Sequence, residues 1–127
     1  MKGLILIAMI FCHIVDDYYL QGILASMKQK EWWQVNAPRH LYKYDYLMAL
    51  FMHSFSWTCS IMLVPIIYVF TISETLHQAI YLFLFVENIA IHMFVDDLKA
   101  NRREINLISD QLLHLYQIFL TWFVLVF

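Results

Sequence analysis

The sequence predicts an all-α integral membrane protein, a bundle of four membrane-spanning helices with a short interfacial segment between the first and second helices. Composition is the first reason. Of 127 residues, 62% are hydrophobic and 14% are charged, against roughly 45–50% and about 25% in soluble domains. Too little polar surface is available to cover an apolar core in water. With only two glycines and two prolines for linkers, we expect a single domain, residues 1–127.

Four apolar segments are the second reason. The predicted helices span residues 3–25, 47–70, 77–95 and 107–127. With about 19–24 residues each and a rise of about 1.5 Å per residue, they are long enough to cross a hydrocarbon core of about 30 Å. A bilayer offers no partners to free backbone groups, so these segments should be helical. Pro65 lies inside the second segment, where a membrane helix tolerates it.

The longest link, residues 26–46, predicts the interfacial segment. It places aromatic rings among basic side chains: Trp32, Trp33, Tyr42, Tyr44 and Tyr46 with Lys28, Lys30, Arg39 and Lys43. Such mixtures are typical of the boundary between lipid and water, where rings lie at the depth of the headgroups. Packing of the same rings against the helices is an alternative that is compatible with this placement.

The distribution of lysine and arginine predicts the orientation. Four of these residues lie in the link 26–46 and three in the link 96–106, whereas only Lys2 lies on the opposite side. Basic links stay in the cytoplasm, so both links are predicted to be cytoplasmic and both termini to lie outside. The net charge of −2 and the lack of a basic tract give no indication of nucleic-acid binding.

Polar side chains inside the predicted helices indicate a site. A charge at the centre of a bilayer costs about 2.5–3.5 kcal/mol, so such groups usually face the protein interior. Spacings of four residues place several of them on shared helix faces. The set is His13, Asp17 and Gln21 in the first helix, His53 in the second, His92, Asp96 and Lys99 at the end of the third, and Asp110, Gln111, His114 and Gln117 in the fourth.

These groups are predicted to share one depth. The first and third helices run inward and carry the polar residues near their ends, whereas the second and fourth run outward and carry them near their starts. At about 1.5 Å per residue, all of them fall within about 20 Å of the cytoplasmic boundary. The sequence therefore predicts one polar cluster in the cytoplasmic half of the bundle.

Metal binding is the first chemistry that suits this cluster, because imidazole and carboxylate groups on facing helices bind Zn, Mn or Fe. The predicted metal ligands are His13, Asp17, His53, His92, Asp96, Asp110 and His114. The predicted supporting groups that orient them are Gln21, Gln111 and Gln117. Asp16 or Asp97 can replace its neighbouring aspartate if a helix is rotated. A path for protons or ions and a hydrogen-bond network that holds the helices together are the two alternatives.

The same motifs resemble a known family. His13-x3-Asp17-x3-Gln21, His53, His92-x3-Asp96-x2-Lys99 and Asp110-Gln111-x2-His114 are similar, in this order, to the bacterial and phage membrane family called domain of unknown function 3307. The match runs from about His13 to Gln117, and Lys28 resembles a basic residue that the family places after its first helix. The pairs Asp16-Asp17 and Asp96-Asp97 and the long aromatic link depart from the family pattern. The resemblance implies a bacterial or phage origin and a site, without implying a reaction.

We therefore expect a multi-pass protein of the bacterial inner membrane with a site that faces the cytoplasm and binds a divalent metal ion. A substrate at that depth comes from the inner leaflet, which favours a metal-dependent hydrolase acting on a lipid or a lipid-linked phosphate. The predicted catalytic residues are Asp17, His92, Asp96 and Lys99, with an aspartate or histidine as general base and Lys99 orienting an anionic group. The alternative is a non-enzymatic membrane effector that binds a host membrane protein or alters the permeability to ions or protons.

Overall fold

The structure, a computed structural model, describes residues 1–72 and 75–127. Within these residues it contains helices and connecting turns and no strand, so the all-α prediction is confirmed. The elements in chain order are α1 (Lys2–Val15), the π-helical turn η1 (Asp16–Leu20), α2 (Leu24–Met27), α3 (Lys30–Asn36), the 3₁₀ turn η2 (His40–Tyr42), α4 (Asp45–Ile72), α5 (Thr75–Asp97), the π-helical turn η3 (Leu98–Arg102) and α6 (Leu107–Val126).

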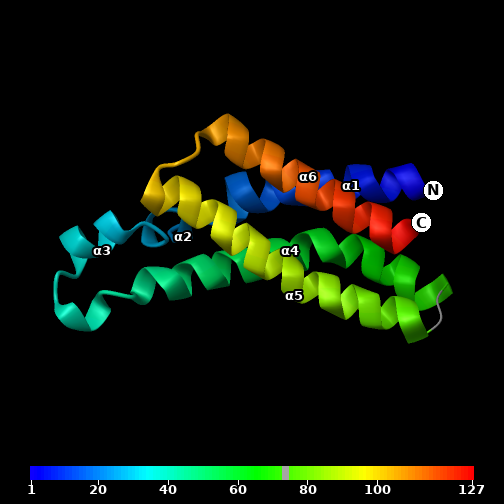
Figure 1. Cartoon of the computed structure of the whole chain (residues 1–127), viewed down its shortest axis with the longest axis horizontal. Helices are drawn as coiled ribbons and strands as arrows, with labels where there is room; N and C mark the ends of the chain where they lie inside the picture. The colour runs from blue at the N-terminus through cyan, green and yellow to red at the C-terminus, as the bar shows by residue number, and fades with distance from the viewer. Residues whose placement is uncertain (73–74) are drawn as a thin grey trace.

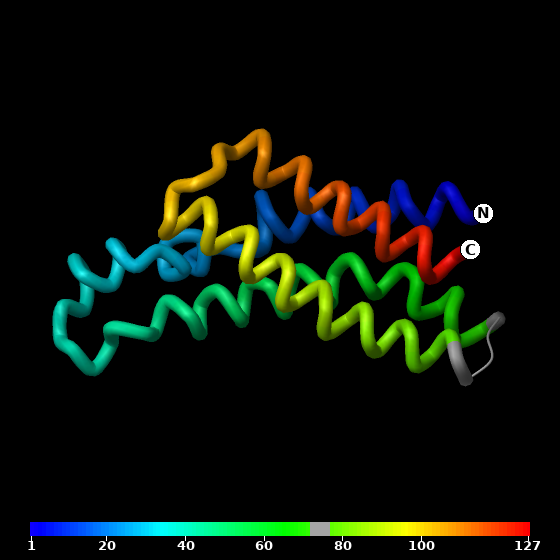
Figure 2. Tube along the Cα trace, viewed as in Figure 1, coloured from blue at the N-terminus to red at the C-terminus, as the bar shows by residue number. Residues whose placement is uncertain are grey.

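The long helices α1, α4, α5 and α6 pack lengthwise against one another (Figures 1 and 2). Helix α4 contacts α1 and α5, and α6 contacts α1 and α5 in turn. Both termini lie at one end of the molecule, whereas α2, α3 and the chain between α5 and α6 lie at the other end (Figure 1). The two links rich in lysine and arginine therefore share one end.

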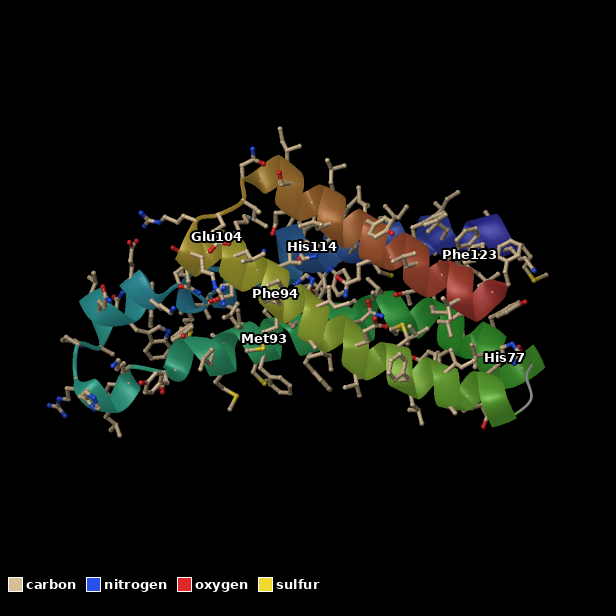
Figure 3. All side chains as sticks on the ribbon, in the orientation of Figure 1. His77, Met93, Phe94, Glu104, His114 and Phe123 are labelled. Carbon is tan, nitrogen blue, oxygen red and sulfur yellow. The ribbon has the colours of Figure 1, made fainter. Side chains whose placement is uncertain are left out.

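Three helical stretches are long and apolar enough to cross a membrane: Lys2–Leu20, His40–Thr71 and His77–Arg102. Four were predicted. Helix α6 is 20 residues long but does not belong to this group, because the polar side chains between Asp110 and Gln117 lower its mean hydropathy. Large apolar side chains point outward along all of the long helices, among them Ile7, Ile67 and Phe83, each more than half exposed (Figure 3). Helices that face lipid carry such side chains on their outer faces.

The first helix ends earlier than predicted. The sequence indicates a helix to residue 25, but the regular α-helical turns stop at Val15 and η1 follows. In η1 the backbone N–H of Gln21 donates to the Asp16 carbonyl oxygen at 3.0 Å. Gly22 then adopts a φ of +50°, which glycine reaches without steric cost. A π-helical turn inside a helix is frequent at functional sites, and here it carries both Asp16 and Asp17.

The apolar core occupies the half of the molecule near the termini. Its buried side chains include Met9, Ile61, Met62, Ile118 and Leu125, all at most 1% exposed. They come from α1, α4 and α6, and α4 runs through Pro65 without interruption. In the other half of the molecule, the buried side chains between the long helices include many polar ones, among them His53, His92 and Asp96.

Candidate metal centre

Each of the four long helices contributes one histidine to a single buried cluster. His13 (α1), His53 (α4), His92 (α5) and His114 (α6) are at most 1% exposed. The ring of His92 stacks on the ring of His114 with centroids 4.1 Å apart and lies 5.1 Å from the ring of His53, and the ring of His13 lies 5.8 Å from that of His114. Figure 3 shows His114 on the inner side of α6. Together with Asp16, Asp17, Asp96 and Asp110, these residues are called the His/Asp cluster below.

Asp96 lies at the centre of this cluster. Its Oδ2 atom is 3.3 Å from Nε2 of His53 and 3.8 Å from Nε2 of His92, and its Oδ1 atom is 3.5 Å from Nε2 of His114. Asp17 approaches from η1, with Oδ1 3.4 Å from Nε2 of His53. One carboxylate of α5 thus faces three histidines of three different helices.

Two groups of these residues have the spacing of metal ligands. Asp17, His53 and His92 form one group, and His92, Asp96 and His114 form the other, with one ligand atom from each residue and all atoms of a group within 4.8 Å of one another. Metal bonds of about 2.0–2.1 Å at tetrahedral angles place neighbouring ligand atoms about 3.3–3.4 Å apart. The Nε2 atoms of His53 and His92 are 3.2 Å apart, and Oδ1 of Asp17 is 3.4 Å from Nε2 of His53. These distances fit ligands that surround one ion.

Several polar atoms of the cluster are buried and have no hydrogen-bond partner among the described residues. They are Asp16 Oδ2, Asp17 Oδ1, Asp110 Oδ1, the Nδ1 atoms of His53 and His92, and both ring nitrogens of His114. Five of these seven atoms instead face an ionisable group of the cluster at 3.4–3.8 Å, which is longer than a good hydrogen bond. A bound cation would engage the carboxylate oxygens and ring nitrogens that point toward it.

Two lysines at the edge of the cluster neutralise two of its carboxylates. Lys28 donates to Oδ2 of Asp96 at 2.7 Å, and Lys99 donates to Oδ2 of Asp110 at 2.7 Å. Lys99 was predicted to orient an anionic substrate group, and the structure pairs it with Asp110. Lys28, which the sequence singled out only through the family resemblance, holds the central carboxylate.

The structure distinguishes the members of both aspartate pairs. Asp96 faces the histidines, whereas Asp97 accepts hydrogen bonds from Asn101 and Arg102 outside the cluster. Asp17 faces Nε2 of His53, while the fully buried Asp16 lies 3.8 Å from Nδ1 on the other side of the same ring. A carboxylate behind a ligand histidine orients its ring in many metal sites, so Asp16 has a supporting position.

Two of the predicted ligands flank the candidate ligand groups without belonging to them. Nδ1 of His13 lies 3.5 Å from Oδ2 of Asp17, and it accepts a hydrogen bond from the Trp57 indole at 2.8 Å. Oδ1 of Asp110 lies 3.5 Å from Nε2 of His114. His13 and Asp110 therefore each contact a member of a ligand group, Asp17 and His114 respectively, without belonging to a group themselves.

The predicted supporting glutamines separate into three cases. Gln111 donates to Asp17 at 3.3 Å and to Asp110 at 3.1 Å, so it links two carboxylates of the cluster. Gln21 donates to the backbone carbonyl of Asp17 within its own turn. Gln117 lies elsewhere, in a second buried group with Asn88 and Thr121, which is called the amide cluster below.

Sequence reasoning missed three contacts made by α4. Besides the Trp57 indole on His13, Ser56 and Ser60 donate to Oδ1 of Asp16 at 2.8 and 3.1 Å. The signal was present in the spacing, because Ser56, Trp57 and Ser60 follow His53 by three, four and seven residues and so share its helix face.

Comparisons with known proteins add no assignment. No described protein family, no curated protein and no solved structure matches this chain. The resemblance to domain of unknown function 3307 therefore stays an expectation drawn from the motifs, and the site has to be interpreted from its own geometry.

Proposed function

We propose that this chain is a membrane-embedded, metal-dependent hydrolase that acts on a lipid or a lipid-linked phosphate at the cytoplasmic face of a bacterial inner membrane. The observation that carries the proposal is the convergence of imidazole nitrogens and carboxylate oxygens from four helices at ligand spacing, with several of those atoms unpartnered.

The four-helix membrane bundle and its orientation form the first part of the proposal. Three helical stretches are long and apolar enough to cross a membrane, and α6 packs beside them. Both termini lie at one end and the two basic links at the other (Figure 1), which suits an even number of crossings with the basic links in the cytoplasm. Reporter fusions to each terminus are expected to give an extracytoplasmic signal, and cytoplasmic termini would overturn this orientation.

The chemistry forms the second part. A divalent ion held by these residues would act as a Lewis acid and would make water nucleophilic near neutral pH. With the ion held by the group His92, Asp96 and His114, Asp17 would be placed to accept the proton of the attacking water, because its Oδ1 atom has no hydrogen-bond partner while Gln111 holds its Oδ2 atom. The water oxygen forms a new bond to phosphorus, the phosphorus–oxygen bond to the leaving alcohol breaks, and the proton taken up by Asp17 passes to that alcohol, so one water is consumed.

The lysines indicate the side from which a substrate approaches. The side chain of Lys99 is 34% exposed and that of Lys28 is 12% exposed, whereas their carboxylate partners are at most 4% exposed. The side of the cluster that carries Lys28 and Lys99 is therefore the part nearest to solvent and headgroups. An anionic phosphate that arrives there meets two ammonium groups before it reaches the carboxylates.

Metal analysis of adjacent aspartate variants tests the site. We expect the purified, chelator-free protein to contain a divalent metal, Asp96→Asn to lose most of it, and Asp97→Asn to keep it. Asp97→Asn is the matched control, because it makes the same change one residue away and outside the cluster. A metal-free wild type, or equal metal content in the two variants, would contradict the site.

Activity then separates the hydrolase from the alternative function. The metal-loaded protein is expected to release phosphate or a headgroup from lipid phosphates in micelles, and Asp17→Asn is expected to lose this activity while it keeps its fold. A protein that binds metal but hydrolyses no lipid phosphate would favour the non-enzymatic membrane effector.

A further inference from the structure

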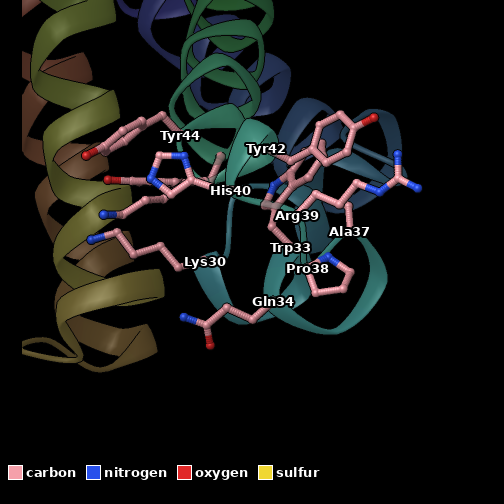
Figure 4. Close-up of a pocket in the computed structure, with 11 residues that line it drawn as sticks. Lys30, Trp33, Gln34, Ala37, Pro38, Arg39, His40, Tyr42 and Tyr44 are labelled. Carbon is pink, nitrogen blue, oxygen red and sulfur yellow. The ribbon is translucent and has the colours of Figure 1, made fainter.

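A second site lies at the end of the molecule that carries α3, η2 and the start of α4. A pocket of about 540 Å³ opens there, and its lining includes Lys30, Trp33, Arg39, His40 and Lys43. Figure 4 shows Lys30, His40 and Tyr44 on one side of the pocket and Arg39 extending from the other side. Its volume is within the range of small-molecule binding sites.

The pocket combines unneutralised positive charge with aromatic rings. Among the described residues, no carboxylate lies within 4.0 Å of the charged groups of Lys30, Arg39 or Lys43, and the pocket has no acidic lining residue. The ammonium of Lys30 lies over the ring of Tyr46 at 4.8 Å, and that of Lys43 lies over the ring of Tyr44 at 5.3 Å. The cations are held in place by rings, which leaves their charge available to an anion.

Contacts with the rest of the chain hold this region in position. Asn101 of η3 accepts a hydrogen bond from the Lys30 backbone amide at 2.7 Å and donates to the Lys28 carbonyl oxygen at 3.1 Å. Arg103 pairs with Glu31 at 2.5 Å. The start of α3 is therefore attached to the chain that follows α5, and these contacts hold the pocket lining in position.

An apolar pocket of about 360 Å³ adjoins the cationic one. Its lining includes Leu24, Met27, Met48 and Met52 together with one acidic residue, Asp45, and Trp33 lines both pockets. The Trp33 indole donates to the Met27 carbonyl oxygen at 2.6 Å, which fixes the ring between the two. Methionine side chains adapt to flexible apolar groups such as an acyl chain.

We propose that these two pockets bind one anionic phospholipid of the cytoplasmic leaflet. The phosphate diester lies by Lys30 and Lys43, and the first part of an acyl chain lies along the methionines. A cationic pocket joined to an apolar one matches an amphiphile better than it matches free phosphate, which uses only the first. Basic groups at this depth are also attracted to the anionic surface of the leaflet. The binding does not require the proposed hydrolase activity, since it uses none of the residues of the His/Asp cluster.

Lipid retention by the purified full-length chain tests the proposal. Native mass spectrometry in a neutral detergent, with dioleoyl phosphatidylglycerol or dioleoyl phosphatidylcholine added, measures the number and affinity of bound lipids. We expect the wild type to retain phosphatidylglycerol more strongly. In Lys30→Gln/Lys43→Gln its affinity should fall about 30-fold, which corresponds to about 1 kcal/mol for each basic group near an anionic lipid.

Two matched variants make this comparison specific. Lys2→Gln/Arg102→Gln removes the same charge from positions outside the pocket, and it is expected to keep the lipid preference. Lys30→Arg/Lys43→Arg keeps the charge and is expected to keep the preference as well. Metal content measured in the same samples separates this site from the His/Asp cluster, because the lysine variants are expected to keep their metal.

Three results would overturn the proposal. One is equal retention of the two lipids by the wild type, which decides the question even if the lysine variants do not fold. Another is an equal loss of phosphatidylglycerol in Lys30→Gln/Lys43→Gln and in the Lys2→Gln/Arg102→Gln control. The third is displacement of the lipid by millimolar inorganic phosphate alone, which would show that the acyl chain contributes nothing to binding.

Discussion

Two buried polar clusters share the helices α5 and α6, and they differ in how fully their atoms are hydrogen-bonded. In the amide cluster, the Asn88 amide accepts from Gln117 at 2.8 Å and donates to the Leu84 carbonyl oxygen at 2.8 Å, while Thr121 bonds to the same amide. Its groups are neutral, and Gln117 Oε1 is its single unpartnered atom among the described residues. In the His/Asp cluster the groups are ionisable, and many ring nitrogens and carboxylate oxygens are unpartnered.

The difference separates a network that holds helices together from a set of ligands. Hydrogen bonds between membrane helices contribute about 0.6–2 kcal/mol each, and the amide cluster uses nearly all of its donors and acceptors in this way. Ring nitrogens and carboxylate oxygens that make no hydrogen bond add no such stability, and in the His/Asp cluster these atoms belong to residues that could hold a metal ion. Variants in the two clusters should therefore affect different properties, one metal affinity and the other stability.

The largest effect is expected for His92→Gln. His92 belongs to both candidate ligand groups, so its loss removes a ligand from each. We expect metal affinity to fall by more than the 10–100-fold that loss of a merely orienting group costs, as measured by elemental analysis and titration calorimetry. His77→Gln makes the same change at an exposed position of the same helix and should leave the affinity unchanged. Equal affinities in the two variants would contradict the ligand role.

Lys28→Met is expected to have the next largest effect. It leaves the buried Asp96 carboxylate without the ammonium 2.7 Å away, and breaking a buried ion pair costs about 3–5 kcal/mol. Because the Lys28 side chain is 12% exposed, we expect a loss of about 2 kcal/mol in the free energy of unfolding. The loss should be larger with chelator than with added metal, since a cation can replace the lysine charge. A loss that does not depend on metal would place the ion away from Asp96.

Asn88→Leu tests the other side of the comparison. It removes the partner of Gln117 and Thr121, and we expect the free energy of unfolding in mixed detergent to fall by about 1–2 kcal/mol. Metal content should stay at the wild-type level because no candidate ligand contacts this amide. If the variant lost its metal, the two clusters would have to be regarded as one site.

The smallest effect is expected for Ser60→Ala. Oδ1 of Asp16 loses the hydroxyl at 3.1 Å but keeps that of Ser56 at 2.8 Å, so stability should fall by less than about 1 kcal/mol. Metal affinity should fall by less than about tenfold, because Asp16 reaches the cluster only through His53. Ser56→Ala/Ser60→Ala removes both donors and should cost more than the sum of the single variants. Strict additivity would show that the two hydroxyls act independently.

Much of the candidate site was predictable from local spacing. The four histidines and the i, i+4 pairs of His13 with Asp17, His92 with Asp96 and Asp110 with His114 were identified from the sequence, and all of them meet in the cluster. Gln117 shows where this reasoning stops. It continues the polar face of α6 beyond His114, but its hydrogen bonds are made to Asn88, and no local signal indicated that a second group would form there.

The sequence by itself determined the helical character of the chain and the gathering of polar residues toward the end with the basic links, because both follow from the spacing of apolar and polar residues. It also determined which end carries the basic charge. It did not determine that the first helix ends at Val15. Only the tertiary structure decided which atoms meet. Successive residues of a helix point about 100° apart, so a small rotation exchanges Asp16 for Asp17 or Asp96 for Asp97. That rotation is set by packing between distant segments and by the π-helical turns η1 and η3. Such contacts, including those of Lys28 with Asp96 and Trp57 with His13, join residues too far apart in the chain for spacing to reveal.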